Sequence, residues 1–449
     1  MVIHWWGLIP FVAMLSIIAL APLIPTTAHI WERNRVKLIV ATALGVPVAT
    51  WMWLGGGQHL VVHSLNEYTQ FICLLFSLYV VSGGLFVAGD IRATPRNNVI
   101  LLCLGAVLAS FIGTTGAAML LIRPILNTNR EREFKVHTVV FAILIIANCG
   151  GLLTPLGDPP LYIGLMRGVP FAWTFTLWAP WMFVNAMLLL TYYAIERREA
   201  TRESEFGRAW DEQATAPLRL RGGLNIIWFA AIIGSVALLG DHPWIKIAVQ
   251  LGAAAASYFI GSRSVRMRDN EFTWAPIAEV AILFFGIFAT MTPALEFLRL
   301  HAGQLPLNEY TLFGFTGGLS SVLDNAPTYL TFFEMATQLS VDGGTVVAGV
   351  PEIYLTAISL GAVTCGALTY IGNGPNFMVK SVAEERGVRM PSFGGYIVWT
   401  LRYLAPVLLT MVLIFISTSA LANLCGIALA LLIAGNALRI IAATRRREA

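Results

Sequence analysis

Apolar segments of about 20 residues recur along almost the whole chain, and they restrict its fold more than any other feature. Only a helix or a closed barrel satisfies the backbone inside a bilayer, and long continuous apolar runs favour helices. We therefore predict an all-α polytopic membrane protein. The predicted crossings are the eleven segments 5–25, 36–55, 68–89, 138–166, 173–195, 224–240, 245–261, 273–297, 351–380, 395–418 and 419–441.

Composition agrees with a chain that lies mostly in lipid. Hydrophobic residues make up 57% of it and charged residues 12%, whereas a soluble domain carries about 25% charged residues. An ordinary soluble enzyme, a disordered protein and a nucleic-acid-binding protein are therefore excluded. The five cysteines lie in apolar segments without metal-ligand spacing, so we expect free thiols.

Four apolar stretches differ from simple spans. Residues 98–126 and 309–340 each split into two short arms around a polar tip, which suits a re-entrant hairpin. Segments 138–166 and 351–380 are overlong and are interrupted by Gly and Pro, so we expect broken helices there.

Basic residues predict the orientation of the chain. Most of the 29 Lys and Arg residues fall in one alternate set of loops, and that set faces the cytoplasm by the positive-inside rule. The N-terminus is then outside and the C-terminus inside. The long polar stretch 196–222 is expected to be a cytoplasmic linker rather than a domain.

The order of segments indicates an inverted repeat. Residues 1–195 and 223–418 each contain three spans, a hairpin, a broken helix and one more span, while 419–449 adds a helix and a basic tail. Five crossings per half is an odd number, so the second half must be upside down relative to the first.

The polar positions of the two halves agree with this register. Ser110 in the first hairpin corresponds to Ser321 in the second, and Thr154 in the first break corresponds to Thr369 in the second, at nearly the same offset. Chance similarity between apolar sequences rarely reproduces such an order.

The two breaks and two hairpin tips predict an ion site. Helix breaks leave unpaired carbonyls and half-helix N-termini near the bilayer midplane, and oxygen ligands suit a hard cation such as Na⁺. An ionised carboxylate at that depth costs at least about 2.5–3.5 kcal/mol, so Asp158 and Asp324 are the main candidates. Their alternative role is structural, as caps of a half-helix or a hairpin. The predicted site comprises Thr114, Thr115, Thr154, Gly157, Asp158, Asp324, Asn325, Thr369, Asn373, Asn376 and Lys380, with Asp158, Asp324 and Asn325 as the sodium ligands.

Other charged residues are weaker candidates. Glu279 could be an interfacial acid and Glu334 could face a wall between domains, while Lys380 could hold a substrate carboxylate or anchor the inner end of a helix. The histidines occur in loops or at span ends, and we expect them to be solvated: His4, His29, His59, His63, His137, His242 and His301.

Three motifs resemble one superfamily of ion transporters. The run 150–160, GGLLTPLGDPP, resembles its broken-helix motif, and the runs 320–327, SSVLDNAP, and 372–376, GNGPN, resemble the second hairpin and second break of its NhaD-type and arsenite-type members. The run 373–380, NGPNFMVK, suggests a bacterial branch described as citrate transporters or sodium/proton antiporters. The first hairpin tip, Gly113-Thr114, departs from the Ser-Asn-Thr of dicarboxylate symporters and from the Asp-Asn of NhaD-type members.

The resemblance implies a homodimer in a bacterial-type inner membrane, with a fixed scaffold and a transport domain that moves as an elevator. We expect a small ion or organic anion as substrate, no nucleic acid, no organic cofactor and no enzymatic activity. The leading hypothesis is a secondary transporter that exchanges Na⁺ for H⁺ on Asp158 and Asp324. The alternatives are a citrate-like organic-anion transporter, an arsenite-type oxyanion carrier, and a membrane enzyme or channel.

Overall fold

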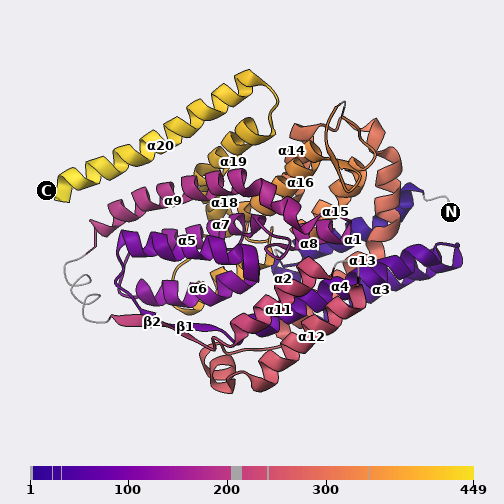
Figure 1. The fold of residues 1–449 in the computed structure, drawn as a ribbon, viewed down its shortest axis with the longest axis horizontal. Helices are drawn as coiled ribbons and strands as arrows, with labels where there is room; N and C mark the ends of the chain where they lie inside the picture. Colours follow the sequence, from indigo (N-terminus) through magenta and orange to yellow (C-terminus); the bar gives the residue numbers. More distant parts are fainter. Residues whose placement is uncertain are drawn as a thin grey trace.

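A computed structural model describes residues 4–22, 24–31, 33–203, 215–239, 242–341 and 343–448, and these residues form a predominantly helical molecule (Figure 1). The helices of the first half are η1 Trp5–Leu8, α1 Ile9–Leu20, α2 Pro25–Trp31, α3 Asn34–Leu54, α4 Gln58–Ser82, α5 Pro95–Ile112, α6 Thr114–Thr128, α7 Val136–Ile145, η2 Cys149–Leu152, α8 Pro159–Met166, η3 Phe171–Leu177 and α9 Trp178–Ala200.

The helices of the second half follow the described part of the linker. They are α11 Asn225–Leu238, α12 Pro243–Ile260, η4 Val265–Asp269, α13 Ala275–His301, η5 Ala302–Gln304, α14 Glu309–Ser320, α15 Asn325–Ala336, α16 Glu352–Cys365, η6 Gly366–Leu368, α17 Gly374–Glu385, α18 Phe393–Tyr403, α19 Ala405–Met411, η7 Val412–Ile416 and α20 Ala420–Glu448.

The prediction of a polytopic helical membrane protein is confirmed. Of the described helices, five are long and apolar enough to cross a membrane alone, and the pair formed by α18 and α19–η7, bent by 41°, makes a sixth. Each of the eleven predicted segments contains helix, but several of those helices are short, among them α1, α7, α11 and α16. The count of eleven crossings and the inverted arrangement therefore stay predictions.

Two short antiparallel sheets were not predicted. Strand β1, Phe86–Asp90, pairs with β2, Ala216–Arg221, so the end of the linker is fixed against the loop that follows α4. A second sheet joins β3, Val346–Val347, to β4, Val350–Pro351. The central part of the predicted linker, 204–214, lies outside the described residues.

The predicted hairpins and broken helices coincide with interruptions of helix. Helices α5 and α6 meet at Gly113, whose φ of 83° lies in the left-handed region that favours glycine. Helices α14 and α15 are separated only by residues 321–324. Long breaks divide α7 from α8 and α16 from α17, and in both cases proline stands in the first turn of the second helix.

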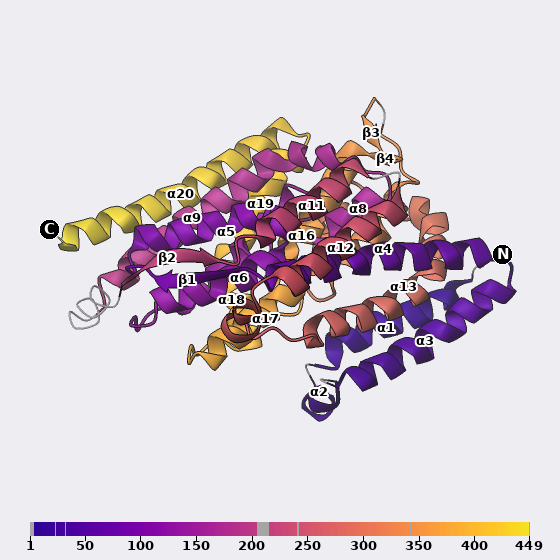
Figure 2. The same cartoon turned by 60° about the horizontal axis from the view of Figure 1, so that its bottom comes forward.

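The helices form two packed groups. We call α1, α3, α4, α11, α12 and α13 the lateral bundle, because these helices pack mainly on one another. We call α5–α8 and α14–α17 the hairpin bundle, in which α6 packs on α17 and α8 on α15. Helices α5, α9 and α20 lie at one end of the molecule, and α1, α3 and α13 lie at the other (Figure 1, Figure 2).

Candidate functional site

Asp158 stands at the first break, as the residue before helix α8. Pro159 and Pro160 follow it and start the helix. Proline suits a first turn because it has no backbone N–H, and the N–H groups of a first turn have no acceptor within the helix. Gly157 packs so closely on Gly151 that a Cβ at position 157 would overlap the carbonyl of Gly151. The backbone N–H of Thr114, at the tip of the first hairpin, donates to the carbonyl of Gly157 at 2.8 Å. The break and the hairpin tip are therefore joined through their backbones.

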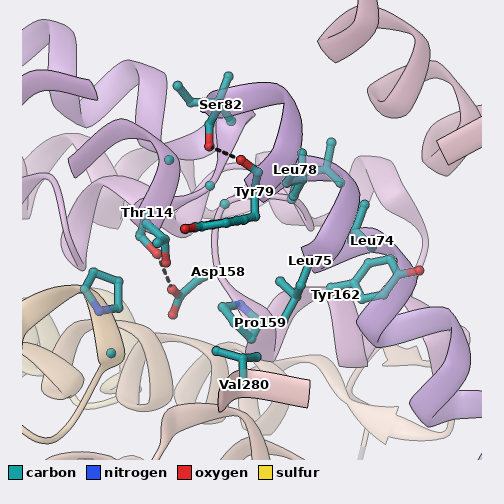
Figure 3. A pocket seen from close by; sticks show the side chains of 18 of the residues that line it. Leu74, Leu75, Leu78, Tyr79, Ser82, Thr114, Asp158, Pro159, Tyr162 and Val280 are labelled. Atoms are coloured by element: carbon teal, nitrogen blue, oxygen red, sulfur yellow. Dashed lines mark hydrogen bonds between the residues drawn. The ribbon is translucent and has the colours of Figure 1, made fainter. Parts of the chain in front are cut away.

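The Asp158 carboxylate collects donors from three other segments. It is 1% exposed. Its Oδ1 accepts from the Thr114 hydroxyl at 2.8 Å and from Asn373 Nδ2 at 3.4 Å, and its Oδ2 accepts from Asn325 Nδ2. The Thr114 bond and the carboxylate are visible in Figure 3. All three donors are neutral, and among the described residues no Lys, Arg or His nitrogen lies within 4.0 Å of this carboxylate.

Asn325 adds an unused acceptor beside this carboxylate. Its side chain is fully buried at the start of α15, and its amide nitrogen is engaged by Asp158. Its Oδ1 has no hydrogen-bond donor within the described part of the chain. Leaving a buried acceptor unpaired costs about 1–3 kcal/mol. A carboxylate and an orphaned amide oxygen side by side are ligands that fit a cation.

A cavity opens in front of Asp158 (Figure 3). It measures about 810 Å³, counting the space at its mouth. Thr114 and Asp158 form its polar end, and an apolar wall from α4 and α13 faces them, with Leu74, Leu78 and Val280. None of the residues that line this cavity is Lys, Arg or His. In this state, therefore, no basic side chain of the cavity lining neutralises Asp158.

The second break is tied to the first through buried amides. Asn148 Nδ2 donates to Asn376 Oδ1 at 2.7 Å, and Asn373 Nδ2 donates to Asn148 Oδ1 at 3.2 Å. Asn376 in turn donates to the carbonyls of Gly366 and Thr369. These bonds set the position of Asn373 next to Asp158.

In each half, a threonine hydroxyl at the break forms a hydrogen bond to a backbone carbonyl of the hairpin. The Thr154 hydroxyl donates to the carbonyl of Ser110, and the Thr369 hydroxyl donates to the carbonyl of Ser321 at 2.5 Å. These are the two residue pairs that the sequence register aligns.

Most of the predicted site residues lie in or next to this cluster. Thr114, Asp158, Asn325 and Asn373 are in contact, Thr115 and Gly157 line the cavity, and Thr154, Thr369 and Asn376 support it.

Two predicted residues have other partners. The Asp324 Oδ1 accepts from the N–H of Ala326, so it caps α15, and it makes no hydrogen bond to Asp158. Lys380 Nζ pairs with Glu384 at 2.7 Å, one turn further along α17.

Sequence reasoning missed several buried polar groups. Asn148 stands in an apolar run ten residues before Asp158, and that isolated amide was a usable signal. His137 was expected to be solvated, but it is buried and its Nε2 lies 2.5 Å from Glu196. The expectation failed because Glu196 belongs to a distant helix, α9.

The weaker acidic candidates form ion pairs in the structure. Glu279 lies 2.5 Å from Lys37 of α3. Glu334 lies 2.6 Å from Arg167, the residue that ends α8, and Arg167 also contacts Glu67 of α4 at 3.0 Å. The last contact joins the hairpin bundle to the lateral bundle.

Comparison with known proteins gives a consistent result. A family model described as "Putative citrate transport" matches residues 1–416. Two curated proteins, one from Mycobacterium bovis and one from Mycobacterium tuberculosis, are each named an uncharacterized transporter. Each is 26% identical to this chain over 323 residues, which is 68% of this chain and 73% of the relative.

Proposed function

This chain belongs to the citrate transport family, and from that premise we propose that it is a secondary active transporter that exchanges a cation such as Na⁺ for protons. One observation carries the proposal: the Asp158 carboxylate is buried, faces a cavity and has only neutral donors around it. Its negative charge needs a partner at that depth, and either a proton or a cation can supply one.

The ligands around Asp158 suit a hard monovalent ion. A carboxylate oxygen, the free Oδ1 of Asn325 and the Thr114 hydroxyl are oxygen donors. Within the described ranges, no three His, Cys, Asp or Glu side chains gather as a site for a tightly held metal. A single carboxylate binds a cation weakly enough to release it, as transport requires. Because a proton and a cation occupy the same carboxylate, each displaces the other.

We further propose that the hairpin bundle carries this site past the lateral bundle, as an elevator built on two inverted repeats. The hydrogen bonds from Thr154 to Ser110 and from Thr369 to Ser321 support the repeat, since they join equivalent residues in the two halves. The proposal includes Asp324 as a second titrating acid, a homodimer, a bacterial-type inner membrane and an outer N-terminus.

A citrate-like organic anion is the second candidate substrate. The family description names citrate, and the first turns of α6, α8 and α17 border the cavity, where their N-terminal dipoles favour an anion. The absence of any basic side chain among the cavity-lining residues weighs against this candidate, because Asp158 would repel the anion.

Reconstitution into vesicles tests both candidates. Purified protein is placed in acid-loaded vesicles with a trapped pH dye, and Na⁺, Li⁺ or K⁺ is added outside. We expect internal alkalinisation with the wild-type chain and none with Asp158→Asn, which keeps the size of the side chain but cannot titrate. Uptake of labelled citrate without any response to cations would reject cation exchange and favour the anion.

A further inference from the structure

Lys246 is a buried cation that the site described above does not use. It lies in the first turn of α12 and is 4% exposed. Its Nζ donates to Gln70 Oε1 of α4 at 2.9 Å and lies 5.9 Å from the centre of the Tyr162 ring of α8. No carboxylate of the described residues is within 4.0 Å of it. A charge buried without a counter-charge is expensive, so its retention calls for a reason.

Gln250 lies one turn beyond Lys246 on the same face of α12, beside the hydroxyl of Tyr162. Its side chain is fully buried, and within the described structure neither its Nε2 nor its Oε1 makes a hydrogen bond. The Tyr162 hydroxyl faces this amide without completing a hydrogen bond to it in the described structure. The Lys246 ammonium and the Gln250 amide are both buried, and neither has an anionic acceptor among the described residues. Together they could bind a carboxylate.

The carboxylate that could reach this place is Asp158. Asp158 and Tyr162 are four residues apart at the start of α8, so they lie one above the other on the same side of that helix. Tyr162 packs beside Phe71 of α4, with ring centres 6.4 Å apart, whereas Asp158 shares its cavity with Leu78 and Tyr79 further along α4. Helix α8 therefore runs antiparallel to α4.

We propose that Lys246 is the counter-charge of the unloaded Asp158 in the second state of the transport cycle. A shift of α8 along its own axis by about one turn, roughly 5–6 Å, would move Asp158 to the level that Tyr162 now occupies, beside Lys246 and Gln250. This inference rests on the proposed function, because it needs a hairpin bundle that moves against the lateral bundle.

The other end of α8 supports the same movement. Arg167 contacts Glu334 within the hairpin bundle and Glu67 of the lateral bundle. The shift would carry Arg167 and Glu334 together away from Glu67. Helix α8 would thus exchange one contact with the lateral bundle, Arg167 with Glu67, for another, Asp158 with Lys246.

This exchange has a consequence for coupling. Once the cation has left Asp158 in the shifted state, Lys246 holds the bare carboxylate in place until a proton or a new cation displaces the ammonium. The hairpin bundle then cannot return empty. The ammonium also competes with the cation, so it lowers the apparent cation affinity of that state.

Cysteine cross-linking tests the movement independently of transport. In a background without the five native cysteines, the pair Tyr162→Cys/Gln250→Cys reports the state described here, and Pro159→Cys/Gln250→Cys reports the shifted state. Both pairs keep Asp158 and Lys246. We expect both pairs to cross-link in membranes with a short bifunctional reagent, and the single variants not to. Failure of the second pair while the first pair reacts would overturn the proposal.

Vesicle exchange assays test the role of the charge. We expect Lys246→Met to lower the cation concentration for half-maximal exchange by about tenfold, the lower end of the effects measured for removing one charge of a close pair. Lys246→Arg should stay near wild type, and Lys37→Met, which removes a buried lysine of α3 remote from α8, serves as the control. Size-exclusion profiles check folding.

The outcomes are distinguishable. Active wild-type vesicles with an unchanged cation requirement in Lys246→Met would reject the role of Lys246 alone. Wild-type vesicles that show no cation-dependent pH change would reject the proposed function, and the cross-linking result would still decide whether α8 shifts.

Discussion

At the scale of single residues, the distinguishing feature of the site is that Asp158 has no basic partner in the described part of the chain. Among the described residues, the other buried carboxylates have basic partners: for example, Glu196 contacts Arg132 and His137, and Glu67 contacts Arg167. Asp158 is equally buried, yet its partners are a threonine hydroxyl and two asparagine amides. Neutral donors stabilise the ionised carboxylate but do not neutralise its negative charge, so an exchangeable cation can still bind there.

Asn325 provides the sharpest test of this geometry. We expect Asn325→Ala to weaken apparent cation affinity by about tenfold to a hundredfold, because it removes a donor to Asp158 and the free Oδ1 together, a loss of about 1–3 kcal/mol. The measurement is the cation dependence of dye-reported proton exchange in vesicles.

A matched control exists in Asn185. It is a buried asparagine of α9 whose Oδ1 is also unpaired in the described structure, but its amide donates to the carbonyls of Cys149 and Trp181 rather than to a carboxylate. Asn185→Ala should leave the cation dependence unchanged. Equal effects of the two substitutions would mean that Asn325 acts on folding only.

At the scale of elements, the break before α8 depends on a contact between two glycines. A Cβ at Gly157 would overlap the backbone of Gly151, and neither backbone can move without disturbing the hairpin tip. We expect Gly157→Ala to destabilise the protein by about 3 kcal/mol or more, as overpacking against a rigid backbone does.

Gly374 is the natural control for that substitution. It begins α17 at the equivalent end of the second break, and a Cβ there would meet open space. Gly374→Ala should be neutral or slightly stabilising. Thermal unfolding of the protein in detergent measures both, and similar melting temperatures would contradict the close contact at Gly157.

The ion pair between α4 and α8 gives a prediction about conformation. Glu67→Gln should weaken the contact that joins the two bundles in the state described here, since Arg167 keeps only Glu334. A change of about 1–2 kcal/mol alters a two-state population by about five- to thirtyfold. We therefore expect slower maleimide labelling of Ser82→Cys, which lies in the cavity.

The control for this prediction is Glu271→Gln. Glu271 pairs with Arg123 at 3.3 Å, but its side chain is 79% exposed, and such pairs contribute little. Labelling rates that are the same in Glu67→Gln and Glu271→Gln would show that the α4–α8 contact does not hold this state.

Elements were predictable where the signal is local. Proline and glycine mark the breaks at Pro159 and Gly374, and the apolar runs mark helices, because helix formation and helix interruption depend on neighbours in sequence. The β1–β2 sheet and the burial of His137 were missed, since their partners, residues 216–221 and Glu196, are remote in sequence. The role of Asp324 as a cap of α15 needed coordinates, because a carboxylate before a helix suits both a cap and an ion site.

At the scale of the whole molecule, the cavity and the Arg167 ion pairs occupy opposite ends of the contact between the two bundles. The cavity extends to Ser82, at the end of α4, and Pro276, at the start of α13. Glu67 and Arg167 lie further toward the start of α4 and the end of α13, where His63 and Glu296 border a smaller pocket. Alternating access requires that, in any one state, the site is accessible from one side of the membrane and closed on the other. A cavity at one end of the contact between the bundles and ion pairs at the other end fit such a state.

The distribution of basic residues then predicts which side the cavity faces. The loop between α12 and α13 contains Arg263, Arg266 and Arg268, and the positive-inside rule predicts that it is cytoplasmic. This loop leads into the start of α13, where Pro276 lines the cavity. We expect an impermeant maleimide to label Ser82→Cys only from the cytoplasmic face, in inverted membrane vesicles. It should label His63→Cys, whose native side chain is 62% exposed, from outside intact cells. The reverse pattern would invert the orientation, and Lys246 would then meet the unloaded Asp158 on the cytoplasmic side instead of the outer side.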